Sequence, residues 1–565
     1  MTHLDWAVLV GTIGFIVIYG AWKTRGVTGV EGYLRGDNSL KWPTIGLSVM
    51  ATQASAITFL STPGQAYDDG MGFVQFYFGL PLAMIVISTV IVQIYYRLKV
   101  FTAYEYLETR FDLRTRLLGA FLFLVSRGLA TGITIYAPAI ILASIMGWPL
   151  NATCLAIGSI VIVYTVMGGT KAVSQTQKQQ MVVMLGGMVV AAIVIVTKLP
   201  KEVSLSGAAH VAGALGRMEI VDFKFDLSNR YNFWSGITGG FFLALAYFGT
   251  DQSQVQRYLS GRSVTESRFG LLFNGVLKIP MQLLILFVGI LVFVFYQFVE
   301  PPVTFNRSAR QAVHATEYSL QLTEIETRWS VNHAEKRGYA ERYVAALDAD
   351  DAPAAAAAKL QLAEAGDRTR GLRNEASAII AKAAPRAETK DRDYIFISFV
   401  LDYLPKGLVG LLLAVILSAA MSSTASELSA LGSTTTIDFY KRTFRPDASD
   451  LHYLRASKLF TAFWGVLTVA FASYASLLDN LIQAVNILGS LFYGTVLGIF
   501  LTGFFLKSVR GPAVFMAAIV AEILVIGLWK YDVVAYLWFN VIGCAAVAFL
   551  SLVITAVQPR AQEAA

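Results

Sequence analysis

The sequence has few charged residues, cysteines and histidines for its length. Only 15% of its 565 residues are Asp, Glu, Lys or Arg, against roughly 25% in soluble domains. The two cysteines, Cys154 and Cys544, both fall in apolar segments, which excludes a disulfide framework and a cysteine metal cluster. The five histidines lie in terminal or loop segments. This placement argues against a membrane-embedded metalloenzyme.

Long hydrophobic runs take the place of the missing charge. Hydrophobic residues make up 55% of the chain, and the mean hydropathy is +0.57. Apolar runs long enough to cross a bilayer recur about thirteen times. They cover residues 6–22, 42–66, 72–96, 117–146, 150–167, 181–197, 233–258, 269–298, 407–438, 459–475, 481–506, 512–529 and 533–557. The sequence therefore predicts an all-α polytopic protein of the lipid bilayer.

The loops between these runs alternate in charge, which predicts the orientation. The loops at residues 23–41, 97–116, 257–268 and 441–458 are basic, whereas the loops between them, such as residues 67–70, are acidic or mixed. The positive-inside rule then places the N-terminus outside and the C-terminal tail in the cytoplasm. We expect a multi-pass protein of the cell membrane, a bacterial inner membrane. The net charge of +7 lies in these loops, so we expect no nucleic-acid partner.

The runs fall into two sets of five with opposite topology. Residues 42–198 start from a cytoplasmic loop, and residues 231–506 start from an outer one. Inverted-repeat transporters have this arrangement, and the first helix of each of their sets is discontinuous. Pro63-Gly64 and Gly239-Gly240 lie in the two helices concerned. The predicted units are residues 1–41, 42–198, 199–230, 231–299, 300–393, 394–506 and 507–565, the last being two helices and a short tail.

Residues 300–393 differ from the rest of the chain because they are charged and rich in alanine. Asp348, Asp350, Asp351 and Pro353 interrupt them midway. The pattern predicts a helical hairpin, over residues 308–346 and 354–384, inserted in an outer loop. A solvated insertion and a ligand-binding domain are the two interpretations, and we favour the insertion.

Two uncharged runs carry many hydroxyls and small residues, at positions 48–64 and 418–426. Sodium requires about five oxygen ligands to replace its water. Ala419 and Ser422 lie three residues apart, so a carbonyl and a hydroxyl can converge there, with Ser423 adjacent. A broken first helix would leave the carbonyls of Ala51 and Ala54 free. The alternative is that small residues simply allow close helix packing.

Five motifs resemble the sodium/solute symporter family, which includes sodium–galactose, sodium–proline, sodium–iodide and sodium–monocarboxylate carriers. They are SAITFLSTPG at 55–64, TIYAPA at 134–139, GGTKAV at 168–173, GTDQSQVQRY at 249–258 and AMSS at 420–423. The resemblance implies a five-plus-five inverted-repeat fold. It also implies a sodium site formed by the carbonyls of Ala51, Ala54 and Ala419 and the hydroxyls of Ser422 and Ser423.

The resemblance carries over other positions as well. Tyr247 corresponds to the aromatic inner gate, Gln53 to the polar residue of the broken helix, and Gln483 to an amide of the tenth core helix. Lys278 matches a lysine of the sugar carriers, but Ala244 replaces the asparagine of their sugar pocket. That departure argues against a hexose.

A second cation site of several relatives is altered in this sequence. The aspartate that serves it is replaced by Gln177, and a companion serine by Ala425, although Ser426 remains. We therefore expect one sodium ion per transport cycle.

Arg127 is an ionisable residue inside an otherwise uncharged run. Such charges are costly in a membrane, and they are usually paired or functional. Arg127 either binds a carboxylate of the solute, since a guanidinium matches that geometry, or forms a structural pair with Asp251 or a helix-end carbonyl.

These observations predict a sodium-coupled symporter that imports a small organic solute by alternating access and acts as a monomer. An anionic solute, such as a monocarboxylate or sialic acid, is slightly favoured, and a sugar is the alternative. We expect the solute to contact Gln53, Thr58, Gln75, Arg127, Tyr247 and Gln483. The alternatives from other classes are a transporter-like solute sensor and a membrane-embedded enzyme. The few residues after Val557 and the absence of a catalytic constellation argue against both.

Overall fold

The computed structural model describes residues 2–23, 30–35, 38–201, 203–385, 389, 391–473 and 481–557. Within these ranges the chain forms helices and no strand, which confirms the all-α prediction. Part of the predicted basic loop at 23–41 and the predicted tail after Val557 lie outside the described residues.

Ten helices of the described chain are long and apolar enough to cross a membrane, and one bent pair adds an eleventh span. The bent pair is α3 (Trp42–Gln53) and α4 (Ala56–Asp69). Two further predicted runs are helical, but neither is counted among these spans. The first is α1 (His3–Lys23), and the second is divided into η4 (Ser235–Gly239), α11 (Gly240–Thr250) and α12 (Gln252–Leu259).

The helices of the first predicted repeat follow α3 and α4 in chain order. They are η2 (Met71–Tyr77), α5 (Leu80–Val86), η3 (Ile87–Ile91), α6 (Val92–Leu98), α7 (Glu105–Arg110), α8 (Leu113–Met146) and α9 (Leu150–Lys198). Two short helices flank this set, α2 (Val30–Arg35) and α10 (Leu205–Ala214).

The second predicted repeat begins with η4, α11 and α12. It continues through α13 (Val264–Phe298), α17 (Arg392–Tyr403), α18 (Leu408–Thr434), η5 (Thr435–Phe444), α19 (Asp450–Ala472) and α20 (Leu481–Phe505), and α21 (Gly511–Lys530) and α22 (Leu537–Val557) follow it. The short helix α17, which lies between the insert and α18, was not predicted.

Both first helices of the two sets are broken, as predicted. Ala54 leaves helical geometry (φ −84°, ψ 74°) between α3 and α4, which meet at a bend of 60°. Asp251 is extended (φ −77°, ψ 119°) between α11 and α12. A third break divides α9 at Gly169, where φ of +61° favours glycine and where a Cβ would lie 2.6 Å from the ring of Tyr33.

Helix α18 occupies the centre of the bundle, where 83% of its apolar stretch is buried within the protein. It packs against α3, α4, α8, α9 and α19. The hydroxyls at positions 418–426 are therefore enclosed by protein and do not face lipid.

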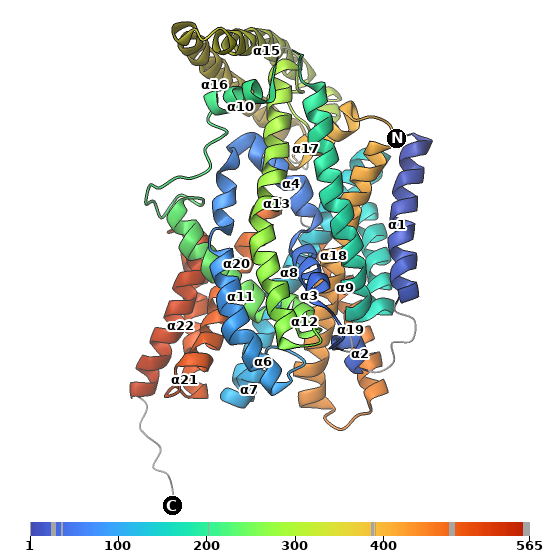
Figure 1. Cartoon of the computed structure of the whole chain (residues 1–565), viewed down its shortest axis with the longest axis vertical. Helices are drawn as coiled ribbons and strands as arrows, with labels where there is room; N and C mark the ends of the chain where they lie inside the picture. The colour runs from blue at the N-terminus through green and yellow to red at the C-terminus, as the bar shows by residue number, and fades with distance from the viewer. Residues whose placement is uncertain are drawn as a thin grey trace, which may run out of the picture.

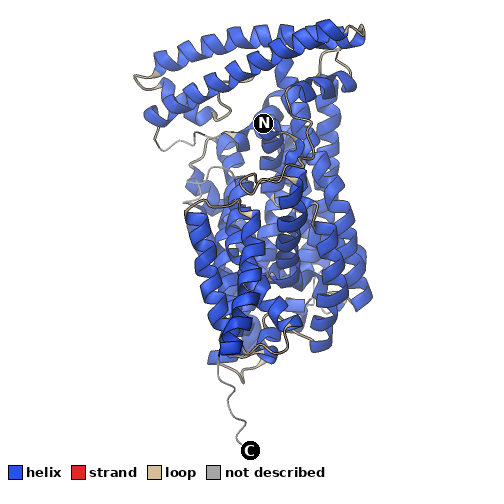
Figure 2. Cartoon of the chain, turned by 90° about the vertical axis from the view of Figure 1, so that its left-hand side faces the viewer, coloured by secondary structure: helices blue, strands red, loops and turns tan. Residues whose placement is uncertain are grey.

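The predicted hairpin is present in the insert and crosses the end of the bundle (Figures 1 and 2). It consists of α14 (Arg307–His314), α15 (Ser319–Asp348) and α16 (Ala352–Ala383), so that the first predicted helix is in fact two helices. Asp351 caps α16 by accepting a hydrogen bond from the amide of Ala354 at 3.0 Å. The insert has an apolar cluster of its own, which includes Leu322, Trp329 and Leu372.

The first helix, α1, begins at the face that carries the insert, and α22 ends at the opposite face (Figure 1). The start of the chain and the insert thus share one side of the bundle, as the charge pattern predicts. The assignment of that side as the outer one stays a prediction.

The half of the broken helix that lies nearer the insert, α4, packs backbone to backbone on its neighbours. A Cβ at Gly64 would lie 2.0 Å from the carbonyl oxygen of Arg392, and one at Gly289 would lie 2.2 Å from that of Pro63. The backbones of α4, α13 and α17 therefore approach one another without intervening side chains.

We predict that Gly64→Ala destabilises the protein by about 1–3 kcal/mol, because the added methyl group forces two backbones apart. The measurement is the midpoint of thermal unfolding in detergent. Gly186→Ala is the matched control, since a Cβ there meets nothing within 4 Å. Equal midpoints for the two variants would contradict the close packing at Gly64.

Candidate functional site

The break between α3 and α4 lies directly beside the serines of α18. The hydroxyl of Ser422 donates to the carbonyl of Ala51 at 3.2 Å. The hydroxyl of Ser423 donates to the carbonyl of Ala419 at 2.9 Å. Ala51, Ala54, Ala419, Ser422 and Ser423 are all buried, with at most 1% of each exposed.

The structure brings two of the predicted sodium ligands together across helices, because Ser422 of α18 meets Ala51 of α3. Ser423 bonds to Ala419 one turn earlier within α18, and Ala54 lies at the break itself. At the break the amide of Ser55 donates to the carbonyl of Gln53 at 3.1 Å. The donor set consists entirely of neutral oxygens, the ligand type that a hard cation prefers. These residues fit a sodium ion.

Gln177 links three helices next to this cluster. Its amide nitrogen lies 3.0 Å from the hydroxyl of Thr52 on α3, and 2.8 Å from the hydroxyl of Ser426 on α18. Its amide oxygen accepts a hydrogen bond from Ser48. The donor group of Gln177 thus points at the hydroxyl oxygens of Thr52 and Ser426, and the single sodium ion per cycle stays a prediction.

A central cavity of about 80 Å³ lies between the broken helix, α8, α11, α18 and α20. Four of the six predicted solute contacts line it, namely Gln53, Thr58, Arg127 and Tyr247. Further residues of its wall were not predicted: Thr52, Ser55, Ile57, Phe76, Tyr77, Thr134, Leu243, Glu427, Ile482, Val485, Asn486 and Tyr493. The side-chain oxygen of Gln53 is buried and has no hydrogen-bond partner in the described structure, so it is available to a donor on the solute.

Two of the predicted solute contacts lie elsewhere. The amide nitrogen of Gln75 donates to the carbonyl of Tyr231 at 2.9 Å, and its oxygen accepts from the amide of Asp222 at 2.9 Å. Gln483 accepts a hydrogen bond from Arg230 at 2.9 Å and lines a separate outer cavity. The structure does not bring Gln75 or Gln483 to the central cavity.

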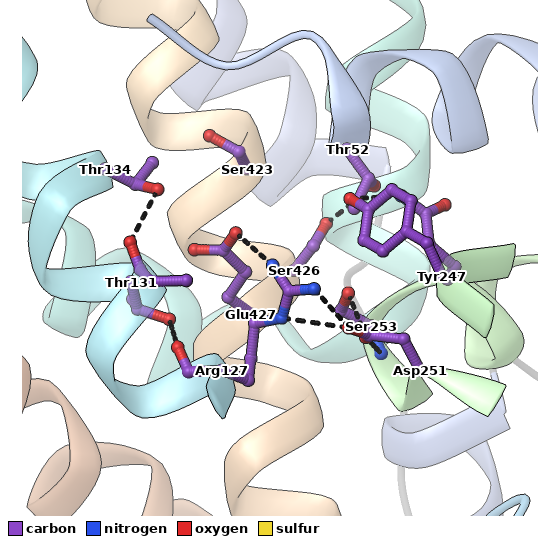
Figure 3. A network of polar contacts seen from close by, with 12 residues as sticks. Thr52, Arg127, Thr131, Thr134, Tyr247, Asp251, Ser253, Ser423, Ser426 and Glu427 are labelled. Atoms are coloured by element: carbon purple, nitrogen blue, oxygen red, sulfur yellow. Dashed lines mark hydrogen bonds and ion pairs between the residues drawn. The ribbon is translucent and has the colours of Figure 1, made fainter. Parts of the chain in front are cut away.

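Arg127 crosses from α8 to a pair of carboxylates at the wall of the cavity (Figure 3). Its Nε donates to Asp251 at 3.1 Å, and one Nη donates to Glu427 at 3.1 Å. The other Nη contacts Asp251 and the hydroxyl of Tyr493. The guanidinium also lies over the ring of Tyr247, 5.2 Å from its centre. The predicted structural pair with Asp251 is therefore present.

Asp251 has a second role at the break of the other first helix. It caps α12 by accepting hydrogen bonds from the amide and the hydroxyl of Ser253, at 2.8 and 2.6 Å. Tyr493 also donates to it at 3.1 Å. Arg127, Asp251 and Tyr493 therefore tie α8, the α11–α12 break and α20 together.

Glu427 is the charged residue of the cavity wall that sequence reasoning missed. It is 4% exposed, and one of its carboxylate oxygens has no partner in the described structure. The signal was present in the sequence, because Glu427 is an acidic residue within the apolar run that also holds Ser422 and Ser423. Arg127 and Glu427 thus line the cavity, while Asp251 lies behind Arg127 and outside the lining.

A bundle with two broken helices, an oxygen cluster at the break and an enclosed polar cavity defines a carrier of small solutes. The sequence model of the Sodium:solute symporter family matches residues 33–317 and 356–521. The chain belongs to this family. The unmatched gap falls on the insert and contains the whole of α15.

Individual relatives match about half of the chain. The human sodium/iodide cotransporter is 35% identical over 278 residues, which are 49% of this chain and 42% of that protein. The human sodium-coupled monocarboxylate transporter 1 is 34% identical over 275 residues, 48% of this chain and 45% of that protein. The alignments thus span less than half of the length of both relatives.

The fold extends over the whole chain. A solved structure of a Na⁺-coupled sialic acid symporter, substrate-bound and outward-open, has a TM-score of 0.76 at 21% identity. The alignment covers 99% of this chain and 98% of that one. The five-plus-five inverted-repeat fold predicted from the sequence is confirmed.

We predict that Arg127→Met destabilises the protein by about 3–5 kcal/mol, because it leaves two buried carboxylates without their cation. The measurement is thermal unfolding in detergent without solute. Adding Asp251→Asn and Glu427→Gln to the variant is expected to restore part of the loss. A stable Arg127→Met protein would show that the guanidinium does not hold these helices together.

Proposed function

We propose that this protein is a sodium-coupled symporter that imports a small organic anion by alternating access. The observation that carries the proposal is the contact at the break between α3 and α4, where the hydroxyl of Ser422 meets the carbonyl of Ala51. Membership of the family and the enclosed polar cavity support it. We assign the face that carries the insert to the outside.

Sodium and solute are coupled because both bind at the broken helix. A sodium ion held by Ala51 and Ala54 would fix the end of α3, next to Gln53 and Thr58 in the cavity wall. Each ligand then favours the conformation that the other prefers, which is the thermodynamic content of coupling. Binding of both would favour the tilt of the bundle that contains the two broken helices.

Tyr247 is positioned to act as the inner gate of the cavity. Its ring lies under the guanidinium of Arg127, and its hydroxyl accepts a hydrogen bond from Gln254 at 2.7 Å. Gln254 belongs to α12, beyond the break at Asp251. A change of angle at Asp251 would therefore move the hydroxyl's partner and release the ring from the cavity.

The charge of the solute determines how far it can be concentrated. One positive charge crossing 100 mV releases about 2.3 kcal/mol, and a tenfold sodium gradient adds about 1.4 kcal/mol. A neutral solute moved with one sodium would thus accumulate several hundredfold. A monovalent anion moved with one sodium carries no net charge, so only the sodium gradient remains, and accumulation is limited to about tenfold.

The identity of the relatives supports an anion. Two relatives are named for iodide and monocarboxylates, and the structural neighbour is a sialic acid symporter. In this chain Arg127 already donates to Asp251 and Glu427. We therefore propose that the carboxylate of the solute is bound chiefly by the hydroxyls of the cavity and by the adjacent sodium ion, and only secondarily by Arg127.

We predict that Ser423→Ala raises the sodium concentration for half-maximal uptake at least tenfold, because it removes one oxygen ligand. The measurement is sodium-driven uptake into proteoliposomes, screened over monocarboxylates, sialic acids, sugars and amino acids. Ser433→Ala is the matched control, since Ser433 is a buried serine of α18 bonded only to the carbonyl of Ala430 in the described structure. Unchanged sodium dependence in Ser423→Ala would refute the assigned site.

We predict one sodium ion per anion, because Gln177 stands where several relatives have the aspartate that serves a second cation site. Uptake of a monovalent anion should then be indifferent to an inside-negative potassium diffusion potential set with valinomycin. The flux ratio of ²²Na⁺ to labelled anion should be one. Stimulation by the potential together with a ratio of two would disprove the single-sodium stoichiometry.

A further inference from the structure

A second and larger cavity lies outside the central one, where the insert meets the bundle. It encloses about 810 Å³ between α16, the start of α17, the end of α4, α20 and α21. Gln483 and Ile487 of α20 line it, while Ile482 and Asn486 of the same helix line the central cavity. The two cavities are therefore adjacent along α20.

Positive charge predominates in the wall of this outer cavity. Its described lining contains five arginines and three aspartates, namely Arg217, Arg230, Arg370, Arg373 and Arg392 with Asp68, Asp69 and Asp391. Two of the arginines, Arg370 and Arg373, belong to the insert. The cavity therefore has an excess of cations that the insert itself helps to supply.

The three aspartates are already paired with two of the arginines. Arg373 contacts Asp391 at 2.6 Å and Asp68 at 3.5 Å. Arg392 contacts Asp68 at 2.8 Å and Asp69 at 2.9 Å. Of the other three cations of the lining, Arg370 is paired with Asp367 of its own helix, whereas Arg217 and Arg230 have no carboxylate partner in the described structure.

Arg217 is the arginine that this excess of positive charge affects most. It forms no ion pair with the described residues, and its Nε is buried without a hydrogen-bond partner. Its guanidinium lies over the ring of Phe293, 5.2 Å from the centre. Lys336 of α15 lies over the same ring at 6.0 Å, and it too forms no ion pair in the described structure. A single aromatic ring thus lies near two cations.

Burial and the nearby Arg217, Arg370 and Arg373 lower the pKa of Lys336 to about 7. The neighbouring His333 does not titrate in the same range, because burial and Lys336 lower its pKa to about 4. The cost of holding these charges together would be relieved by an anion in the cavity.

We propose that the outer cavity is a binding site for a small organic carboxylate, held by Arg217 together with the arginines of the insert. Its place next to the central cavity makes it the first station of the anion on its way inward; this step rests on the proposed function. The insert, which includes the helix outside the family match, is thereby assigned a role in binding.

The test is a ¹⁹F NMR titration of the full-length protein in detergent with trifluoroacetate, in a sodium-free, low-chloride buffer. We expect saturable binding to the wild type and at least tenfold weaker binding to Arg217→Gln. Arg230→Gln is a second variant that removes an exposed charge and so preserves the fold; we expect about threefold weaker binding. Arg342→Gln, on the exposed face of α15, is the matched control and should bind as the wild type does.

Three results would overturn the proposal. The first is a wild type without saturable binding, and the second is equal affinity in Arg217→Gln, Arg230→Gln and Arg342→Gln. The third is displacement of trifluoroacetate by chloride or phosphate at concentrations at which pyruvate fails, since the site would then not be specific for carboxylates.

The pH dependence tests the part played by Lys336. Its amine is protonated below pH 7 and loses its charge above, so the wild type should bind the anion several times more weakly at pH 8 than at pH 6. Lys336→Gln should show a flat profile over this range. A flat profile in the wild type would remove Lys336 from the site.

The two experiments test the outer site and the proposed function separately. Sodium-free binding of trifluoroacetate that is lost in Arg217→Gln, combined with no sodium-driven uptake of any solute, would uphold the site and refute the symporter. Sodium-driven uptake without sodium-free binding would uphold the symporter and refute the site.

Discussion

Unsatisfied backbone groups are costly inside a membrane, and this structure is organised around one place where they occur. The break between α3 and α4 leaves carbonyls without a helical hydrogen-bond partner at membrane depth, where the bilayer offers no water in its place. Helix α18 resolves this by presenting serine hydroxyls, and Ser422 donates directly to Ala51. The burial of α18 in the centre of the bundle follows from this role, because the hydroxyls must face the break and not the lipid.

The same constraint governs the charged residues of the core. Arg127, Asp251 and Glu427 are each almost fully buried, and a lone charge there would be expensive. The three are arranged so that one cation serves two carboxylates, while Asp251 also caps α12. The network therefore joins the helix break, the cavity wall and α20, and a movement of any one of them must rearrange the other two.

The sequence predicted the parts of the molecule that depend on local pattern. Hydrophobic runs gave the spans, and Pro63-Gly64 together with the hydroxyls at 418–426 indicated which two helices meet at the proposed sodium site. Contacts that depend on long loops were not predictable. Gln75 lies in the otherwise apolar segment Met71–Tyr77, and residues of the loop at 222–231 satisfy its amide. Gln483 lies between Ile482 and Asn486, which line the central cavity, but it occupies the other face of α20 and lines the second cavity.

The resemblance to a family and the chemistry of the residues complemented each other at two positions. Gln177 was recognised as a departure from the relatives' pattern, and the structure adds that its amide donates to Thr52 and Ser426. Glu427 was overlooked because the resemblance directed attention to the serines before it. Its significance appears only when Arg127 approaches from α8, 300 residues away in the chain.

Ion pairs connect the insert to α4, the half of the broken helix that moves in the proposed transport cycle. Arg373 of α16 and Arg392 of α17 both contact Asp68, at the outer tip of the broken helix. With 30 residues, α15 is about 45 Å long. If it follows α4, a tilt of about 10° would displace its far end by about 8 Å. The hairpin would thus convert a small rotation of α4 within the bilayer into a larger movement of the far end of α15 on the aqueous side.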